Sequence, residues 1–255
     1  MNTFPPPPPL NLALSEMPRA AYEGLRAFVS MRSLLREYRT CGEGDPVLVL
    51  PGYGASDSST AFIRYFLKQI GFASHALALG RNLENAEDRI RSVDDATRFR
   101  EKMGSLVVSR VRELAEQAGT SISLVGWSMG GLYAVDAARE VPELLRQVIT
   151  LGSPFGDPRG TSLFTLMRRL SGSTVPLETQ DFGSWLAKAS VSEVPTKVIY
   201  SVRDGIVGTG IARLPESPTT EHCQINSSHI GFAHNPDALS EVASTLLNAR
   251  PLLRP

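Results

Sequence analysis

Apolar residues along this chain follow two spacings, short continuous runs and longer stretches with a helical period. The short runs predict strands at 47–50, 72–79, 121–126, 147–154, 196–201 and 221–226, and most of them are rich in Val, Ile and Leu, which is typical of buried strands. The longer stretches predict helices over 18–38, 58–70, 94–118, 129–140 and 236–248. Strands and helices therefore alternate along most of the sequence.

This alternation predicts a mostly parallel sheet of about six strands, covered by helices on both faces. With right-handed crossovers the result is an α/β fold, a three-layer α/β/α sandwich. Ligands of such sheets bind beyond the carboxyl ends of the strands. We therefore expect the functional residues directly after strands.

The length of 255 residues and the hydrophobic content of 42% suit one sizeable core. We expect one domain over 18–255 and a Pro-rich arm over 1–17, because Pro5–Pro9 favours an extended polyproline segment. The apolar residues of the first predicted helix are spaced for one face: Leu25, Phe28, Val29 and Leu35.

Charge and cysteine usage exclude several function classes. Lys and Arg together number 26, as do Asp and Glu, so the zero net charge indicates neither a nucleic-acid footprint nor an electrostatic membrane anchor. A local basic patch remains an alternative, because net charge says nothing about how the charges are distributed. No apolar run approaches the ~20 residues of an integral membrane segment. Cys41 and Cys223 have no metal-site spacing, and we expect two free thiols in a reducing compartment. With no basic residue before the prolines, no secretory signal is indicated, and a cytoplasmic location is expected.

The segment GWSMGG, residues 126–131, matches the pattern G-x-S-x-G between an apolar strand and a predicted helix. A sharp strand-to-helix turn would hold Ser128 in a strained conformation with its hydroxyl above the sheet. Gly126 and Gly130 would avoid collisions with neighbouring backbone. We therefore expect Ser128 to be a nucleophile; a tight glycine turn with a solvent-facing serine is the alternative.

An earlier glycine-rich turn, PGYGAS, follows the first predicted strand. In a fold with this nucleophile turn, one backbone N–H from that segment and one from the residue after the nucleophile form the oxyanion hole. The expected donors are the N–H groups of Tyr53 and Met129. The alternative is an ordinary glycine turn.

The expected acid and base also follow strands. Asp204 comes directly after the fifth predicted strand and His229 after the sixth, which gives the chain order Ser, Asp, His. His229 would accept the serine proton, and Asp204 would orient the imidazole. His234 remains an alternative base. Asp157 and, less plausibly, Asp181 remain alternative acids.

Three segments resemble the α/β-hydrolase superfamily, specifically its small bacterial esterase and lipase-like members. They are LPGYGASD, LVGWSMGG, and the pair SVRDGIV and SSHIGFAHNP, and the resemblance spans about residues 45–248. It implies Asp204 as the triad acid and His229 as the triad histidine. Gly80-Arg81-Asn82 also looks like a segment of such relatives, without an assigned role. The chain departs from the family pattern in that no clear strand pair precedes the first core strand and the N-terminal helix takes that space, so we expect six strands rather than the full eight.

These observations predict a serine carboxylesterase or lipase-like hydrolase that cleaves esters of short to medium acyl chains through an acyl-enzyme, without cofactor or metal. Acyl transfer by the same acyl-enzyme, and related lipase, thioesterase or amidase activities, remain alternatives. The expected partner is a small-molecule ester rather than nucleic acid, and the oligomeric state is left open.

A long insertion over 155–194 contains two apolar stripes with helical spacing. The first stripe comprises Leu163, Leu166, Met167 and Leu170, and the second comprises Phe182, Trp185, Leu186 and Ala189. We expect a small helical cap over the nucleophile, with Trp127, Met167 and Trp185 contacting substrate. The alternative is that both stripes pack only on the sheet and leave an open site.

Overall fold

Six strands form one parallel sheet in the described part of the chain, in the order β2-β1-β3-β4-β5-β6. The computed structural model describes residues 5–78, 80, 82, 90, 92–162, 164, 182–187 and 190–248. The strands are β1 Pro46–Leu50, β2 Ala73–Ala76, β3 Ile122–Trp127, β4 Leu145–Leu151, β5 Thr196–Tyr200 and β6 Thr220–Gln224. The predicted α/β sandwich with six strands is confirmed.

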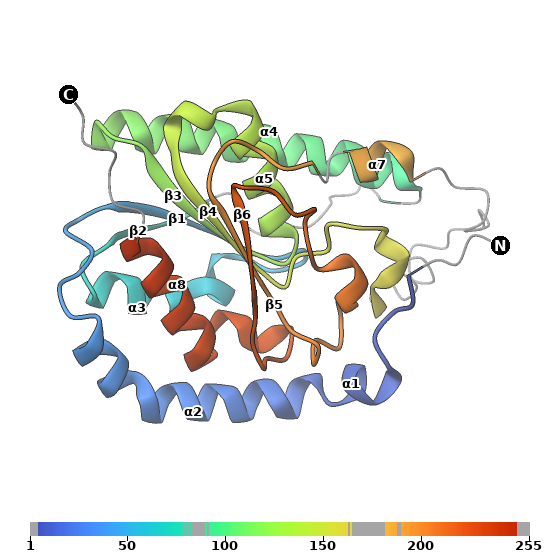
Figure 1. Ribbon diagram of the computed structural model, residues 1–255, viewed down its shortest axis with the longest axis horizontal. Helices are drawn as coiled ribbons and strands as arrows, with labels where there is room; N and C mark the ends of the chain where they lie inside the picture. The colour runs from blue at the N-terminus through green and yellow to red at the C-terminus, as the bar shows by residue number, and fades with distance from the viewer. Residues whose placement is uncertain are drawn as a thin grey trace.

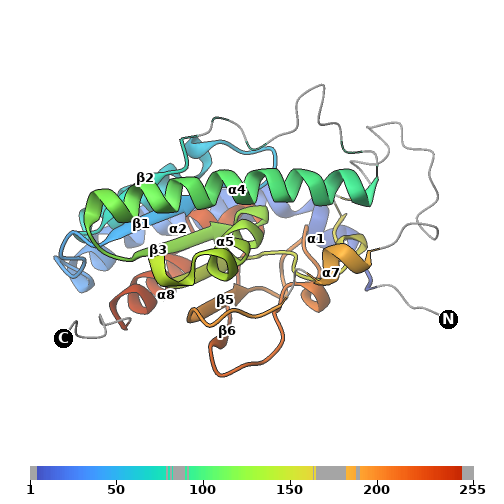
Figure 2. The same ribbon diagram turned by 90° about the horizontal axis from the view of Figure 1, so that it is seen from above.

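Helices cover both faces of this sheet (Figures 1 and 2). One face packs against α4 (Val93–Ala118) and α5 (Met129–Glu140), and the other against α2 (Glu16–Glu37), α3 (Ala61–Gln69) and α8 (Pro236–Asn248). Two short helices complete the described set, α1 (Leu10–Leu14) and α7 (Gly183–Ala187).

Alternation along each strand separates the two halves of the core. In β1, Leu48 and Leu50 point to the α4–α5 side, whereas Val47 and Val49 point to the α2–α3–α8 side. All five residues of β1 are buried, as expected of a central parallel strand.

The predicted end of α4 is confirmed in detail. Gly119 follows the helix with a left-handed φ of 63°, which glycine adopts without steric cost. At its start, Ser92 and Asp95 form reciprocal side-chain to backbone hydrogen bonds, a capping box that fixes where the helix begins.

Helix α2 packs against the domain with the side opposite its apolar stripe. Leu25, Phe28 and Val29 are 61%, 78% and 73% exposed, so they do not pack against the domain. The buried side consists instead of small or acidic residues and one leucine: Glu16, Ala20, Glu23, Ala27 and Leu34. Hydropathy therefore points to the wrong side of this helix, because the two glutamates find hydrogen-bond donors inside.

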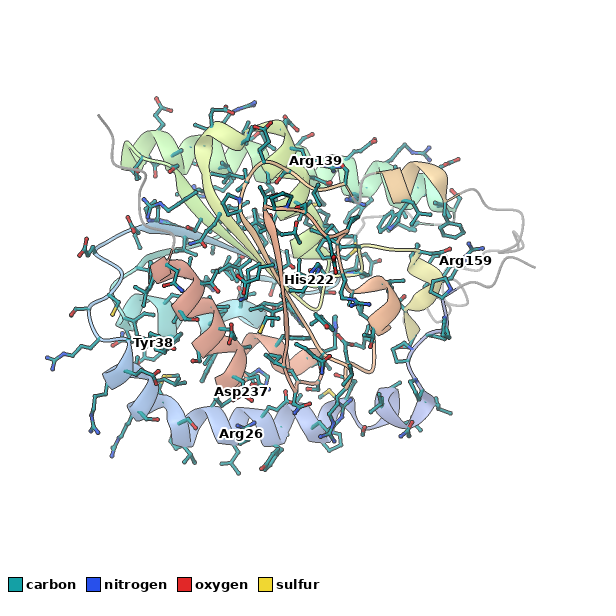
Figure 3. The ribbon with its side chains drawn as sticks, viewed as in Figure 1. Arg26, Tyr38, Arg139, Arg159, His222 and Asp237 are labelled. Atoms are coloured by element: carbon teal, nitrogen blue, oxygen red, sulfur yellow. The ribbon has the colours of Figure 1, made fainter. Side chains whose placement is uncertain are left out.

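Two polar contacts join α2 to α8 (Figure 3). Arg26 forms an ion pair with Asp237, with 3.4 Å between Nη2 and Oδ1. Near the end of α2, the hydroxyls of Tyr38 and Ser240 lie 2.7 Å apart. The helix is thus attached along its length to the domain, although its apolar stripe is not.

Helices α1 and the start of α2 occupy part of the segment expected to be an arm, and the division at residue 17 stays a prediction. Cys41 and Cys223 form no disulfide. Among the described residues, none of the helices combines the length and hydropathy that a membrane span requires.

Candidate active site

Ser128 occupies a strained turn between β3 and α5. Its backbone has φ 55° and ψ −123°, a left-handed conformation that costs a non-glycine residue on the order of 1–3 kcal/mol. A Cβ on Gly126 would lie 2.5 Å from the backbone of Gly130, and one on Gly130 would lie 2.5 Å from the carbonyl oxygen of Leu50. Both positions therefore require glycine, as the sequence pattern predicts.

The structure brings Ser128, His229 and Asp204 together. Nε2 of His229 lies 3.0 Å from Oγ of Ser128, and Nδ1 lies 2.8 Å from Oδ2 of Asp204. The second carboxylate oxygen of Asp204 accepts hydrogen bonds from the backbone N–H groups of Ile206 and Val207, at 2.8 and 2.7 Å. Asp204 is buried with both oxygens in use, and this fixes the carboxylate plane toward the imidazole.

The alternative acid and base lie elsewhere. Asp157 pairs with the guanidinium of its neighbour Arg159, whose Nε lies 2.9 Å from each carboxylate oxygen. His234 packs against α2, with Nε2 2.9 Å from the carbonyl oxygen of Ala20. Asp181 lies outside the described residues. Of the described candidate acids, Asp204 and not Asp157 therefore lies within hydrogen-bond distance of His229.

The expected oxyanion segment lies against the nucleophile. A Cβ built on Gly52 would come within 3.1 Å of the Ser128 Cβ, so the backbone of Gly52 passes close to Ser128. Met129 is the first residue of α5, where backbone N–H groups have no acceptor within the helix. Gly52, Tyr53, Ser128 and Met129 line one pocket.

Asn82 fixes this segment in a way that the sequence analysis missed. Its Nδ2 donates to the carbonyl oxygen of Pro51 at 3.2 Å. Its backbone accepts from the N–H of Gly54 at 2.5 Å and donates to the carbonyl oxygen of Ala55 at 2.7 Å. The hydroxyl of buried Tyr133 donates to Oδ1 at 3.2 Å. Its presence in Gly80-Arg81-Asn82 was the only signal, because these partners are distant in sequence.

Comparison with known proteins identifies the fold. No family model and no curated protein matches this sequence. Among solved structures, a monoacylglycerol lipase from Paleococcus ferrophilus superposes with a TM-score of 0.56 at 14% identity, over 82% of this chain and 96% of that one. A structure of the metagenome-derived lipolytic enzymes LipS and LipT superposes with a TM-score of 0.58 at 17% identity, over 82% and 95%. The chain has the α/β-hydrolase fold.

The same fold also carries other chemistry. A deformylase from Pseudomonas putida S16 matches with a TM-score of 0.50 at 13% identity, over 80% of this chain and 92% of that one. Within the α/β-hydrolase fold, the reaction must therefore be argued from the site itself.

An apolar pocket of about 260 Å³ lies in front of Ser128 and His229. Trp127 and Trp185 line it, whereas Met167 lies outside the described residues, as does the rest of the first predicted stripe. Trp185 belongs to α7, where its Nε1 donates to the carbonyl oxygen of Gly156 at 3.1 Å and its ring lies 5.0 Å from the guanidinium of Arg100. Leu186, expected on the same face, is 43% exposed.

Electrostatics favour the protonated form of His229. Burial by itself lowers the pKa of this imidazole, but the charge and hydrogen bond of Asp204 and the charge of Glu16 outweigh it. The pKa of His229 therefore lies above its ordinary value.

This balance predicts how the imidazole titrates. In the free protein, His229 should titrate above the ordinary value of about 6.5, and Asp204→Asn should lower its pKa because the opposing charge is lost. NMR titration of ring-labelled histidine checks both statements. Asp157→Asn is the matched control and should leave the pKa of His229 unchanged; a drop in that variant instead would contradict the assignment of Asp204.

Proposed function

We propose that this protein is a serine hydrolase that cleaves carboxylic esters of short to medium acyl chains through an acyl-enzyme on Ser128. One observation carries the proposal. The hydroxyl of Ser128 lies 3.0 Å from an imidazole whose other nitrogen lies 2.8 Å from a buried carboxylate, at the mouth of an apolar pocket.

In acylation, Oγ of Ser128 attacks the ester carbonyl carbon while its proton passes to Nε2 of His229. The carbonyl oxygen becomes an oxyanion, which the backbone N–H groups of Tyr53 and Met129 stabilise. The intermediate then collapses, the C–O bond to the alcohol breaks, and the leaving alkoxide takes the proton from His229.

In deacylation, water enters and gives a proton to Nε2 of His229 as its oxygen attacks the acyl carbon. The bond to Oγ breaks, Ser128 recovers the proton, and the carboxylic acid leaves. Throughout, Asp204 holds the tautomer that keeps Nε2 free to accept a proton, and it stabilises the imidazolium.

The lining of the pocket supports an acyl group as the ligand. Most lining side chains are apolar, among them Ile90, Val93, Phe99, Phe164 and Ile206. Two superposed structures come from enzymes described as lipolytic or as a monoacylglycerol lipase, which agrees with an ester substrate.

A fluorophosphonate probe and a panel of p-nitrophenyl esters test the proposal directly. Wild-type protein should hydrolyse the panel and take up one probe molecule, because His229 and the oxyanion donors activate one serine. Ser128→Ala should lose both, whereas Ser105→Ala, an exposed serine of α4, should lose neither.

Two outcomes would count against this assignment. Labelling that persists in Ser128→Ala would place the nucleophile elsewhere. Product analysis with an added alcohol would reveal acyl transfer, the alternative reaction, if the new ester outweighed the free acid.

The pocket predicts an optimum in acyl length. Each CH₂ that becomes buried contributes about 0.8 kcal/mol, so kcat/KM should rise from acetate toward butyrate or hexanoate and fall once the chain outgrows the pocket. Trp185→Ala should move the optimum to longer chains, because its ring lines the pocket. Leu186→Ala, on the exposed side of the same helix, is the control and should leave the profile unchanged.

Asn82→Ala should weaken transition-state stabilisation, because it releases Pro51 and the segment that carries Tyr53. We expect kcat to fall by about 10- to 100-fold, the scale of small misplacements of catalytic groups, with little change in KM. Steady-state kinetics beside Asn248→Ala, an exposed asparagine of α8, measure this effect. A change confined to KM would argue against a role in the oxyanion segment.

A further inference from the structure

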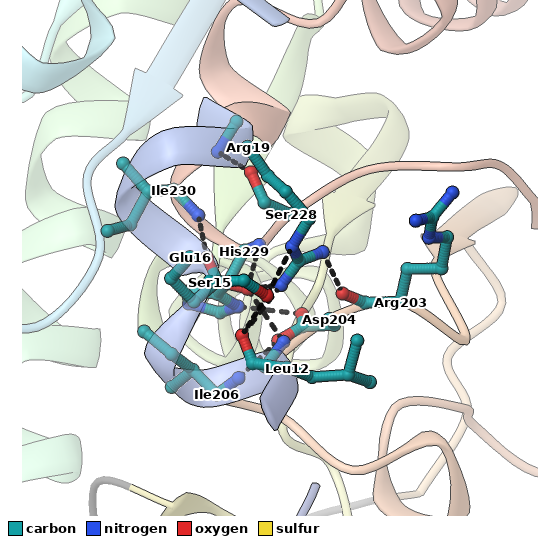
Figure 4. Close-up of polar contacts among 12 residues, drawn as sticks. Leu12, Ser15, Glu16, Arg19, Arg203, Asp204, Ile206, Ser228, His229 and Ile230 are labelled. Atoms are coloured by element: carbon teal, nitrogen blue, oxygen red, sulfur yellow. Dashed lines mark hydrogen bonds and ion pairs between the residues drawn. The ribbon is translucent and has the colours of Figure 1, made fainter. Parts of the chain in front are cut away.

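Two buried carboxylates of α2, Glu16 and Glu23, bind the loops that carry Asp204 and His229. Figure 4 shows the contacts of Glu16. Oε1 of Glu16 accepts hydrogen bonds from the backbone N–H groups of Gly205 and His229, at 2.7 and 3.1 Å. Oε2 accepts from the N–H of Ile230 at 3.2 Å. A single side chain thus connects the residue after the acid with the base and its successor.

Glu23, two turns further along, binds the residues just before the base. It accepts from the N–H of Ser228 at 2.8 Å and from the hydroxyls of Ser228 and Ser227 at 3.0 and 3.2 Å. Together the two glutamates satisfy consecutive backbone donors from 228 to 230, which would otherwise be buried without acceptors.

The loops are shaped to admit this helix. A Cβ on Gly205 would lie 2.5 Å from the carbonyl oxygen of Leu12, and one on Gly231 would lie 1.5 Å from Oε2 of Glu23. Arg19 completes the contact, because it lies 2.8 Å from Glu16 and donates to the carbonyl oxygens of Leu12 and Arg203. The N-terminal helices are therefore part of the site's framework.

We propose that Glu16, supported by Glu23, is a positioning residue that holds the Asp204 and His229 loops together and stabilises the imidazolium formed on His229. This inference rests on the proposed function for its catalytic part. Glu16 does not touch substrate; it acts through the backbone of the base and through its charge.

Charge supports the second part of this role. The charged groups that face the loop of His229 are Asp204 after β5 and, from α2, Glu16 and Glu23, with Arg19 beside Glu16. Burial lowers the pKa of His229, and Glu16 adds to the opposing effect of Asp204. Because the groups are buried, salt screens this interaction only weakly.

Glu16→Gln is the decisive variant, since it keeps the shape but loses the charge and one acceptor. NMR titration should show a lower pKa for His229, and the acid limb of kcat/KM should move to lower pH with it. We expect kcat to fall by about 10- to 100-fold with little change in KM. Glu37→Gln, at the exposed end of the same helix, is the matched control and should change nothing.

An unchanged pKa of His229 in folded Glu16→Gln would overturn the electrostatic role. Glu16→Asp keeps the charge but is one methylene shorter. A wild-type kcat in Glu16→Asp would overturn the positioning role. If Glu16→Gln does not fold, Glu16→Asp provides the test. The NMR titration needs no ester hydrolysis. If the wild-type protein had no esterase activity, the proposed function would be refuted, whereas the titration would still test the electrostatic role of Glu16.

The opposite side of the N-terminal helices supports a second, independent inference. Seven of the eleven exposed large apolar side chains in the described chain lie on α1 and α2: Leu10, Leu14, Met17, Tyr22, Leu25, Phe28 and Val29. In Figure 1, α2 runs along one edge of the molecule, with the other elements all on one side of it. An apolar concentration of this kind marks an interaction surface.

Charge identifies what this surface fits. Between residues 10 and 36 the acidic residues are Glu16 and Glu23, and both are buried. Arg32 and Arg36 are exposed one and two turns beyond Phe28, so the outer side combines apolar residues with basic ones. A second copy of this chain packed on this side would bring only Glu37, at the end of α2, as an exposed carboxylate of that helix, whereas anionic lipid phosphates would pair with both arginines.

We propose that the outer side of α1 and α2 docks on an anionic lipid surface, with the apolar side chains in the interface and the arginines at the headgroups. Vesicle co-sedimentation tests this with phosphatidylcholine alone and with added phosphatidylserine. Wild-type protein should bind the anionic vesicles, and less so at high salt.

Leu25→Ser/Phe28→Ser should weaken partitioning onto vesicles by about tenfold or more, because two apolar side chains that the lipid interface would bury are lost. Arg32→Gln/Arg36→Gln should remove the preference for phosphatidylserine. Leu106→Ser, an exposed leucine of α4, is the control and should bind as wild type.

Three outcomes would overturn this second proposal. They are absence of wild-type binding to either vesicle, unchanged binding of Leu25→Ser/Phe28→Ser, and a lipid-free dimer that this double variant disperses in sedimentation equilibrium. Hydrolysis of soluble esters should be unaffected in the double variant, which separates docking from catalysis.

Discussion

The strained turn at Ser128 is the constraint around which the other parts of the site are arranged. Its left-handed backbone is tolerated only because chain segments approach without side chains between them. Gly130 abuts the end of β1, and a Cβ on Gly131 would lie 1.9 Å from the hydroxyl of Ser153, just after β4. The carboxyl ends of three adjacent strands therefore converge on one serine. The close packing that holds the turn also brings the segment of Gly52 within reach of it.

The two strands that precede Asp204 and His229, β5 and β6, lie progressively farther from β3 in the sheet. Asp204 and His229 must return from these strands on loops whose backbone donors are buried. The loops receive acceptors from outside the sheet, in Glu16 and Glu23. Burying carboxylates is costly unless each oxygen is hydrogen-bonded, and here backbone N–H groups together with the hydroxyls of Ser227 and Ser228 fulfil that condition.

Local patterns explain why so much was predictable. Apolar runs located most of the six strands, although β6 is largely polar. The glycines around Ser128 predicted a turn, and the close backbone approaches there require glycine. The residues that hold this arrangement in place gave no such signal. Asn82 is 31 residues from Pro51, and Glu16 is 189 residues from Gly205. Such pairings depend on the folded path of the chain, so a rule based on local residue spacing does not predict them.

Helix α2 shows how hydropathy can mislead when backbone donors outnumber acceptors inside. A periodicity argument assigns the side with Leu25, Phe28 and Val29 to the core, because burying them releases the most apolar area. The interior at this place presents backbone N–H groups that need acceptors, and each one left unpaired would cost free energy comparable to that of leaving an apolar side chain exposed. The two carboxylates are therefore buried, and the apolar stripe is exposed. The same hydrogen bonds thus account both for the support of the His229 loop on one side of the helix and for the exposed apolar surface on the other.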